Sequence, residues 1–197
     1  MSDAVTVRDL AAGEIAENLT RIAELRIAVF RAFPYLYDGD PAYEAEYLQP
    51  YIRSPGALVA GAFAGGQLVG AATAAPMEDH AEAFAEPLAA AGLDPRDVYY
   101  CGESVLLPAY RGKGVGHRFF DQREARGRAL GRRWCCFCAV IRPADHPARP
   151  ADYRPLDAFW RARGYAPLEG AEARFAWTDL GDTVETEKPM TVWLRAL

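Results

Sequence analysis

The sequence predicts a mixed α/β fold, in which helices flank a central, mostly antiparallel sheet of about seven strands. The apolar segments 57–63 and 67–75 meet at a Gly-Gly pair, which is typical of a β-hairpin turn. A helical pattern over 114–130 separates two strand-like segments, 98–107 and 133–141. A hairpin together with a crossover helix predicts both strand orientations in one sheet.

The N-terminal part is predicted to hold one short strand and two helices. Residues 5–10 are strand-like, and apolar residues at helical spacing predict a helix over 14–33 that ends before a proline. Asp40 is a typical N-cap and Pro41 a typical first helical residue, so we expect a second helix over about 41–52.

Glycine and proline separate the elements that follow the hairpin. We expect a helix over 78–92 that ends at Gly92, and the helix over 114–130 should end at Gly131. A short helix is expected within 156–165, and two strands, 173–180 and 190–197, should close the chain. The whole chain, 1–197, is predicted to be one domain with a helical insertion near 77–97, which could be a lid or a dimer element.

The composition excludes several classes of protein. The net charge is −5, from 22 basic and 27 acidic residues, which argues against general nucleic-acid binding. No secretory signal stands at the N-terminus and no apolar run approaches the ~18 residues of a membrane span, so we expect a cytoplasmic protein with no membrane partner. Cys136 and Cys138 lack a second Cys/His pair at zinc-site spacing, so we expect reduced, buried thiols and no metal.

The segment "RGKGVG" (111–116) lies between a predicted strand and a predicted helix. Its glycines let backbone N–H groups approach an anion, and the helix N-terminus adds partial positive charge. Arg111 and Lys113 add full charges, so the segment suits a pyrophosphate. Because Gly114 stands where a P-loop needs Ser or Thr, a nucleotide kinase is disfavoured.

These residues resemble the acetyl-CoA-binding motif of the GNAT superfamily of N-acetyltransferases. The family pattern, Arg/Gln-x-x-Gly-x-Gly/Ala after a strand, is matched within "SVLLPAYRGKGVGHRFF" (104–120). The segment "AFWRARGY" (158–165) is similar to the later "FYEKLGF" segment of the family, and the predicted element order matches the family fold over nearly the whole chain.

The resemblance implies acetyl-CoA as co-substrate, bound in a V-shaped opening between the strands 98–107 and 133–141. Pantetheine is expected to pair with the first strand. The residues implied for pantetheine are Val105, Leu106 and Leu107; those implied for the pyrophosphate are Arg111, Gly112, Lys113, Gly114, Val115, Gly116 and the N–H of His117.

Glu103 is the candidate general base, because it stands in an otherwise apolar strand close to the implied pantetheine site. The structural alternative is a Glu paired with a nearby Arg at the sheet end. The family often has Tyr as the general acid where this chain has Trp160. Tyr153 or His146 could replace it, or the thiolate could leave unassisted.

The resemblance also implies an amine acceptor, either a small molecule or a peptide terminus, and a possible homodimer. Its site would lie partly on the first two helices, where tyrosines 35, 37, 43, 47 and 51 mix with acidic residues. Such residues suit a cationic amine. Alternatively, the tyrosines pack the helix onto the sheet while the acids face solvent. A non-catalytic acyl-CoA sensor of the same fold is the alternative function, and most arginines over 118–133 are expected to be solvated.

Overall fold

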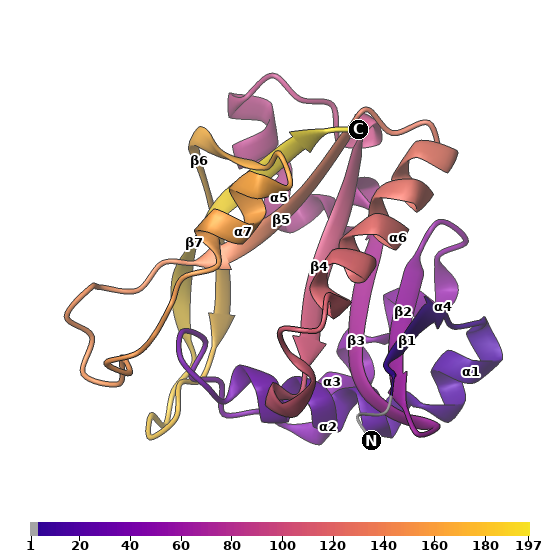
Figure 1. Cartoon of the computed structure of the whole chain (residues 1–197). Coiled ribbons are helices and arrows are strands. Elements are labelled where there is room, and N and C mark those ends of the chain that lie inside the picture. Colours follow the sequence, from indigo (N-terminus) through magenta and orange to yellow (C-terminus); the bar gives the residue numbers. More distant parts are fainter. Residues whose placement is uncertain (1–3) are drawn as a thin grey trace.

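The computed structural model describes residues 4–197 and contains a seven-stranded sheet of order β1-β2-β3-β4-β5-β7-β6 (Figure 1). The strands are β1 (Thr6–Asp9), β2 (Leu58–Ala64), β3 (Gln67–Pro76), β4 (Val98–Leu106), β5 (Trp134–Val140), β6 (Ala166–Trp177) and β7 (Thr186–Ala196). Only β4 and β5 pair in parallel; the other neighbours are antiparallel. The predicted fold class is therefore confirmed.

Helices cover both faces of this sheet. They are α1 (Ala12–Glu17), α2 (Leu19–Phe30), α3 (Pro41–Tyr47), α4 (Gln49–Arg53), α5 (Ala81–Ala90), α6 (Val115–Ala129) and α7 (Asp157–Ala162), with 3₁₀ turns at Met77–His80, Pro95–Asp97 and Pro108–Tyr110. Ile22 of α2 and Phe84 of α5 pack on one face, whereas Phe120 of α6 and Phe159 of α7 pack on the other. Four apolar clusters thus form the core, two on each face.

Local sequence signals were correct at the turns and caps. The Asp40 carboxylate accepts hydrogen bonds from the backbone N–H groups of Ala42 (2.6 Å) and Tyr43 (3.3 Å), and Pro41 begins α3. Gly65 and Gly66 have φ values of 54° and 79° in the β2–β3 turn. Positive φ at both central residues is the requirement of a type I′ hairpin turn, which glycine meets without strain.

Two expected helices are each divided in the structure. The prediction of one helix over 14–33 is wrong: the chain breaks at Asn18, whose side-chain amide donates to the Glu14 carbonyl (2.8 Å), and α2 ends at Phe30. The helix expected over 41–52 is interrupted at Leu48, before Pro50 enters the first turn of α4. A proline has no N–H to continue the ladder of the preceding helix.

The strands β4 and β5 pair over a short distance only. Val98, Tyr99 and Tyr100 lie opposite Trp134, Cys135 and Cys136, and beyond that point the two strands diverge (Figure 1). The opening predicted between these strands is therefore confirmed.

A β-bulge lies in β4 directly after this point. One residue of β3, Thr73, stands opposite two residues of β4, Gly102 and Glu103. A bulge bends its strand and increases the local twist. The bulge thus turns β4 away from β5 where their pairing ends.

The bulge also changes which face of the sheet the following side chains reach. Cys101 and Ser104 both face α6, because Cys101 packs with Phe120 and Ser104 binds a side chain of α6. Glu103 faces the opposite side, where it meets Arg26 of α2. Regular alternation would have placed Glu103 on the same face as Cys101.

A buried arginine holds this irregular strand. Arg123 of α6 is 1% exposed, and its guanidinium donates to the Glu103 carbonyl (3.1 Å) and to Ser104 Oγ (2.8 Å). It also lies over the Phe120 ring, 4.4 Å from the centroid. The expectation of solvated arginines along α6 is wrong at this position, because the bulge leaves a carbonyl that needs a buried donor.

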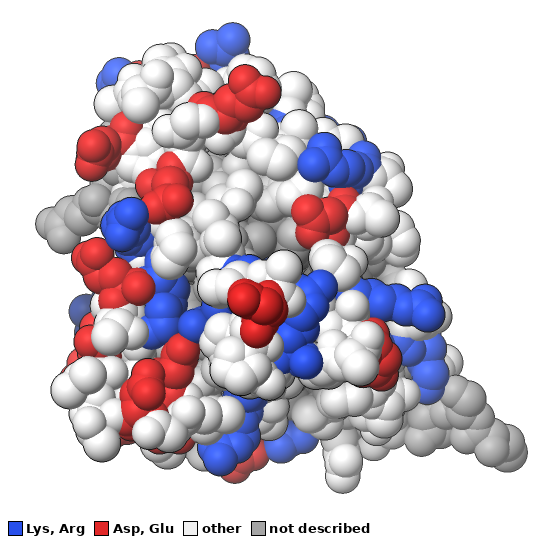
Figure 2. All heavy atoms as spheres, turned by 90° about the vertical axis from the view of Figure 1, so that its left-hand side faces the viewer, with Lys and Arg blue, Asp and Glu red and all other residues white. Residues whose placement is uncertain are grey.

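On the surface, basic and acidic side chains are interspersed over the face that carries β6 and β7 (Figure 2). Within residues 4–197, none of the helices combines the length and the apolar character needed to cross a membrane.

Gly102→Ala is expected to destabilise the fold by about 1–3 kcal/mol, because overpacking a full core costs that much. A Cβ at this position would collide with the Tyr51 hydroxyl and lie 2.6 Å from Thr73 Oγ1. Gly13→Ala is the control, because a Cβ there meets no atom within 4 Å, and it should stabilise α1 by up to about 1 kcal/mol. Urea denaturation of both variants measures the difference; equal stability would contradict the close packing at the bulge.

Candidate functional site

Two cavities meet where β4 and β5 part. A cleft of about 970 Å³ opens toward α6 and α7, and a pocket of about 130 Å³ lies on the side of α2 and α3. Both are lined by Phe30, Tyr35, Gly102, Glu103 and Cys138. A molecule in the cleft and a molecule in the pocket would therefore meet beside Glu103.

The cleft collects most of the residues predicted to bind acetyl-CoA. Its lining includes Leu106, Arg111, Gly112, Gly114, Val115, Gly116 and His117. Val105, Leu107 and Lys113 are not among the lining residues. Val105 packs in the core beneath α2, the Leu107 N–H bonds to Val69 of β3, and the Lys113 ammonium lies over the Tyr110 ring.

The edge of β4 presents the backbone N–H of Leu106 to the cleft. Leu107 N–H donates to the Val69 carbonyl at 3.1 Å, toward β3. Successive N–H groups of a strand point to opposite edges, so the N–H of Leu106 faces the opening. The Leu106 carbonyl accepts from Arg111 Nε at 3.1 Å, which ties the glycine-rich loop to the end of the strand.

The loop before α6 has the geometry of an anion site. Gly112 and Gly114 have φ values of 73° and 74°, and Gly114 is the N-cap of α6. No atom lies within 4 Å of a Cβ built at either glycine, so a ligand can approach the bare backbone there. The free N–H groups of the first helical turn and the charge of Arg111 favour a phosphate.

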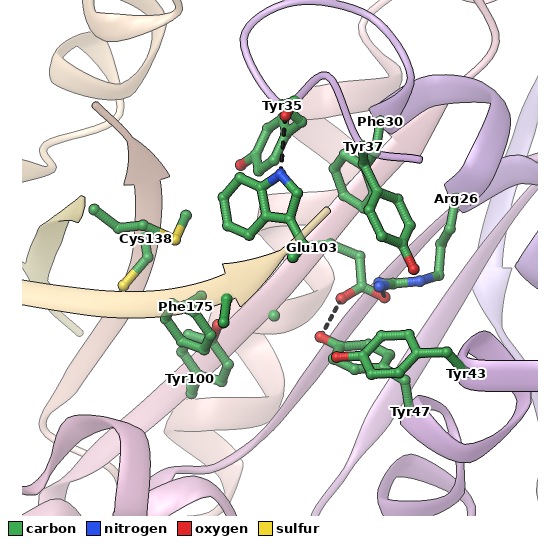
Figure 3. Close-up of a pocket in the computed structure, with 14 residues that line it drawn as sticks. Arg26, Phe30, Tyr35, Tyr37, Tyr43, Tyr47, Tyr100, Glu103, Cys138 and Phe175 are labelled. Atoms are coloured by element: carbon green, nitrogen blue, oxygen red, sulfur yellow. Dashed lines mark hydrogen bonds and ion pairs between the residues drawn. The ribbon is translucent and has the colours of Figure 1, made fainter. Parts of the chain in front are cut away.

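Glu103 belongs to a buried charge cluster on the pocket side (Figure 3). Its Oε2 accepts from the Tyr47 hydroxyl at 2.8 Å, and its Oε1 lies 2.7 Å from Arg26 Nη1 in an ion pair. Arg26 Nε pairs in turn with Glu44 of α3. The three charged side chains are 0–7% exposed. One guanidinium is thus shared by two carboxylates, which gives a net charge of −1.

The protonation of this cluster follows from its neighbours. Burial alone would lower the pKa of Arg26, but Glu103, Tyr47 and Glu44 raise it well above its usual value, so the guanidinium stays charged. Burial raises the pKa of Tyr47 and the Glu103 carboxylate raises it further, so the phenol stays protonated and donates. Arg26 also lies over the Tyr47 ring at 3.9 Å from the centroid.

Tyr43 and Tyr47 of α3 and Tyr51 of α4 lie in a row along a gradient of burial. Tyr51 is 2% exposed, Tyr47 is half-buried and Tyr43 is 53% exposed at the pocket mouth. The expectation that the acids of this segment face solvent is wrong for Glu44, which is 0% exposed. Glu44 is buried because its carboxylate pairs with the positive charge of Arg26, which lies on another helix.

Sequence reasoning missed the far wall of the pocket. Phe175 and Trp177, from the end of β6, complete it, and the Trp177 indole N–H donates to the Tyr35 carbonyl at 3.0 Å. Phe84 of α5 packs behind this wall, with its ring 4.7 Å from Tyr100 and 5.6 Å from Phe175. The insertion near 77–97 thus packs behind the pocket wall. In the sequence, only the apolar pattern of this insertion could have indicated that contact.

Trp160 and the two suggested general acids, Tyr153 and His146, lie in different surroundings. Trp160 lines the cleft and packs on Phe137 and Trp193, with ring centroids 5.0 and 5.1 Å away. Tyr153 lines the cleft and packs edge-on against Phe33 at 4.7 Å. His146 also contacts Phe33 but is not among the cleft residues. Of the two suggested replacements, Tyr153 is therefore the better placed.

The four cysteines are buried and free, as the sequence suggested. Cys138 borders both cavities, and burial raises the pKa of its thiol, so it is protonated at neutral pH. Among the described residues, His, Cys, Asp and Glu side chains form no group of three suited to a metal ion.

Comparison with known proteins now identifies the family. Residues 21–151, about two-thirds of the chain, match the sequence profile of the Acetyltransferase (GNAT) family. The chain belongs to this family. The family match covers β4, the glycine-rich loop, α6 and β5, which are the elements that build the cleft. A search among curated proteins gives no significant match.

Solved structures share the fold over the whole chain. yncA of Salmonella typhimurium, solved with its cofactor acetyl-CoA, has a TM-score of 0.63 at 14% identity and covers 99% of this chain and 95% of its own. The ribosomal-protein-alanine N-acetyltransferase of Brucella melitensis has a TM-score of 0.62 at 14% identity, covering 98% and 99%. The paia N-acetyltransferase of Thermoplasma acidophilum, in complex with coenzyme A, has 0.57 at 16%, covering 98% and 99%.

Arg26→Met is expected to destabilise the GNAT domain by about 3–5 kcal/mol, because it leaves two buried carboxylates without their shared cation. Arg21→Met on the same helix is the control. Its pair with Glu24 has side chains 42% and 58% exposed, so the loss should stay below about 1 kcal/mol. Urea denaturation at pH 7 compares the two, and a similar small loss in both variants would contradict the buried cluster.

Proposed function

We propose that this GNAT protein is an N-acetyltransferase that moves the acetyl group of acetyl-CoA to a primary amine by direct attack on the thioester. One observation carries the proposal: the Glu103 carboxylate lies where the cleft beside the glycine-rich loop meets a separate pocket. The acetyl donor would occupy the cleft and the amine the pocket, with the base between them.

The cleft residues fit acetyl-CoA, which supplies an activated acetyl group when bound. The open backbone at Gly112 and Gly114, with the N-terminus of α6 and the charge of Arg111, suits the pyrophosphate. The free edge of β4 near Leu106 suits the amides of pantetheine. The solved complexes of yncA with acetyl-CoA and of paia with coenzyme A support this assignment for the same fold.

The chemistry needs a neutral amine, because free alkyl ammonium groups have pKa values near 10. Glu103 takes a proton from the amine, whose nitrogen forms a bond to the thioester carbonyl carbon as the C–S bond breaks. The N–H of Leu106 stabilises the negative charge that develops on the carbonyl oxygen. The ammonium group loses two protons in all: the first stays on Glu103, and the second leaves the nitrogen after the attack and passes to the departing thiolate or to solvent. The products are an amide and coenzyme A.

The ion pair with Arg26 does not remove Glu103 from this role. Each carboxylate oxygen has two acceptor positions, so contacts with Tyr47 and Arg26 leave acceptor capacity on Glu103. Glu44 shares the guanidinium, so the charge of Arg26 is not directed at Glu103 alone. The cluster therefore holds the carboxylate in place for proton transfer.

The thiolate has two routes of departure. Thiols have pKa values around 8.5, so a full proton donor is useful but not required. The Tyr153 phenol stands in the cleft, and burial raises its pKa, so it is protonated at neutral pH. Tyr153 is thus the donor that the geometry favours in place of Trp160.

A non-catalytic acyl-CoA sensor is the alternative, and the Trp at 160 is the observation in its favour. Release of free thiol from acetyl-CoA in the presence of a panel of primary amines separates the two. Amine-dependent release supports the transferase. Tight binding of acetyl-CoA with no turnover on any amine would establish the sensor.

Glu103→Gln is expected to lower kcat by about 100-fold or more, which is the usual contribution of a general base. Acetyl-CoA should still bind with its original affinity, because Glu103 faces the pocket and the glycine-rich loop is untouched. Calorimetry measures the affinity for acetyl-CoA, and the pH–rate profile measures the loss of the general base. A variant that keeps both kcat and the pH–rate profile would show that Glu103 is structural.

Gly114→Ala is expected to weaken coenzyme A binding by about 10-fold, because a Cβ would occupy the open space through which the ligand approaches the backbone. Gly66→Ala is the matched control, since its φ of 79° is similar and its Cβ site is equally open, but it lies in the β2–β3 turn. Both variants should lose similar stability, and only the first should lose affinity in calorimetry. Equal affinities would place the pyrophosphate elsewhere.

A further inference from the structure

A carboxylate beside the pocket on the α2 side, that of Glu44, adds negative charge that the lining residues do not cancel. Among the described residues that line it, only Arg26 and Glu103 are charged, and Glu44 shares Arg26 from the side of α3. The cluster therefore has a net charge of −1 in apolar surroundings. Burial and the Glu44 carboxylate both raise the pKa of Tyr37, a residue of the pocket wall. The negative charge of Glu44 thus acts on a group that lines the pocket.

Two further cations lie close to the pocket but are held by other partners. Arg142 and Lys188 lie over the Trp177 ring, 5.9 and 5.1 Å from its centroid, and neither lines the pocket. Arg142 donates to the Asp179 carboxylate from both Nη atoms, at 2.7 and 2.9 Å, and it also donates to backbone carbonyls. Lys188 donates to the Trp177 carbonyl and to Thr186, and its Nζ lies 3.4 Å from Asp179 Oδ1, so the two cations share one carboxylate. Neither is available to a carboxylate on the acceptor.

The rest of the wall is aromatic. Rings from α2, α3, β4, β6 and the loop after α2 enclose the space, and Figure 3 shows them around Glu103. They include Phe30, Tyr35, Tyr43, Tyr100, Phe175 and Trp177. Aromatic faces bind flat apolar groups by stacking and attract cations through their negative faces. A cavity of about 130 Å³ has room for a small group of this kind.

We propose that the acceptor is a primary amine carried on a flat apolar group, with no carboxylate next to the amine. This inference rests on the proposed function of the same site. The protonated amine is drawn to the negative cluster, gives its proton to Glu103, and reacts while the ring lies against the aromatic wall. An α-amino acid brings a carboxylate to the same place, where Glu103 and Glu44 repel it and, among the described lining residues, no cation is free to accept it.

The test compares kcat/KM for three acceptors of the same shape: phenethylamine, L-phenylalanine and L-phenylalaninamide. Phenethylamine and the amide should be acetylated within about 10-fold of each other, and the amino acid roughly 100-fold less well, because like charges brought together in an interface are strongly disfavoured. n-Butylamine tests the ring and should react roughly 10-fold less well than phenethylamine. Equal rates for phenylalanine, or for n-butylamine, would overturn the proposal.

Glu44→Gln tests the source of the discrimination. The variant leaves a neutral Arg26–Glu103 pair, so the preference for phenethylamine over phenylalanine should fall toward about 10-fold. Glu46→Gln is the control, because Glu46 is exposed on the same helix, and its ratio should stay that of the parent protein. The ratio is insensitive to a uniform loss of folded protein. An unchanged ratio in Glu44→Gln would overturn the role of the charge.

The failures of the two proposals are distinguishable. If a peptide N-terminus such as Ala-Gly-Gly is acetylated while phenethylamine is inert, the transferase stands and the acceptor class proposed here is wrong. If acetyl-CoA binds and no amine releases thiol, the proposed transferase function is wrong, and the proposed acceptor class is then wrong as well.

Discussion

The site depends on one local irregularity, the extra residue of β4 opposite Thr73. The bulge increases the twist of β4 immediately after Tyr100, where its pairing with β5 ends. It opens the sheet and, in the same step, turns the Glu103 side chain toward α2. The carbonyl that the bulge leaves unpaired is taken by the buried guanidinium of Arg123. The cleft, the position of Glu103 and the burial of an arginine on α6 thus have one physical cause.

The opening also connects two faces of the sheet that differ in character. On the α6 face the cleft offers backbone: a free strand edge, open glycines and a helix N-terminus. On the α2 face the pocket offers side chains, with aromatic rings around a shared guanidinium. Removing a charge from the second face leaves others unpaired in apolar surroundings, so the arrangement there is stable only as a set. The first face tolerates change in any side chain that does not block the backbone.

This difference explains what could be predicted from the sequence. The hairpin at Gly65 and Gly66, the cap at Asp40 and the loop over 111–116 are encoded by neighbouring residues, so local rules recover them. The contact between Glu44 and Arg26 joins two helices, and the wall from β6 comes from the far end of the chain. The bulge gives no signal except Gly102, and strict alternation along β4 points Glu103 to the wrong face.

The same difference accounts for the low identities to solved structures of the fold. At 14–16% identity the fold is retained over nearly the whole chain. An anion site built from backbone can persist under such change, because backbone geometry needs few fixed side chains. A pocket built from Arg26, Glu44 and a set of aromatic rings cannot, since each member depends on the others. Under the proposed function, the specificity of this chain would therefore lie in the residues that the α2 face adds, and the fold alone would not determine it.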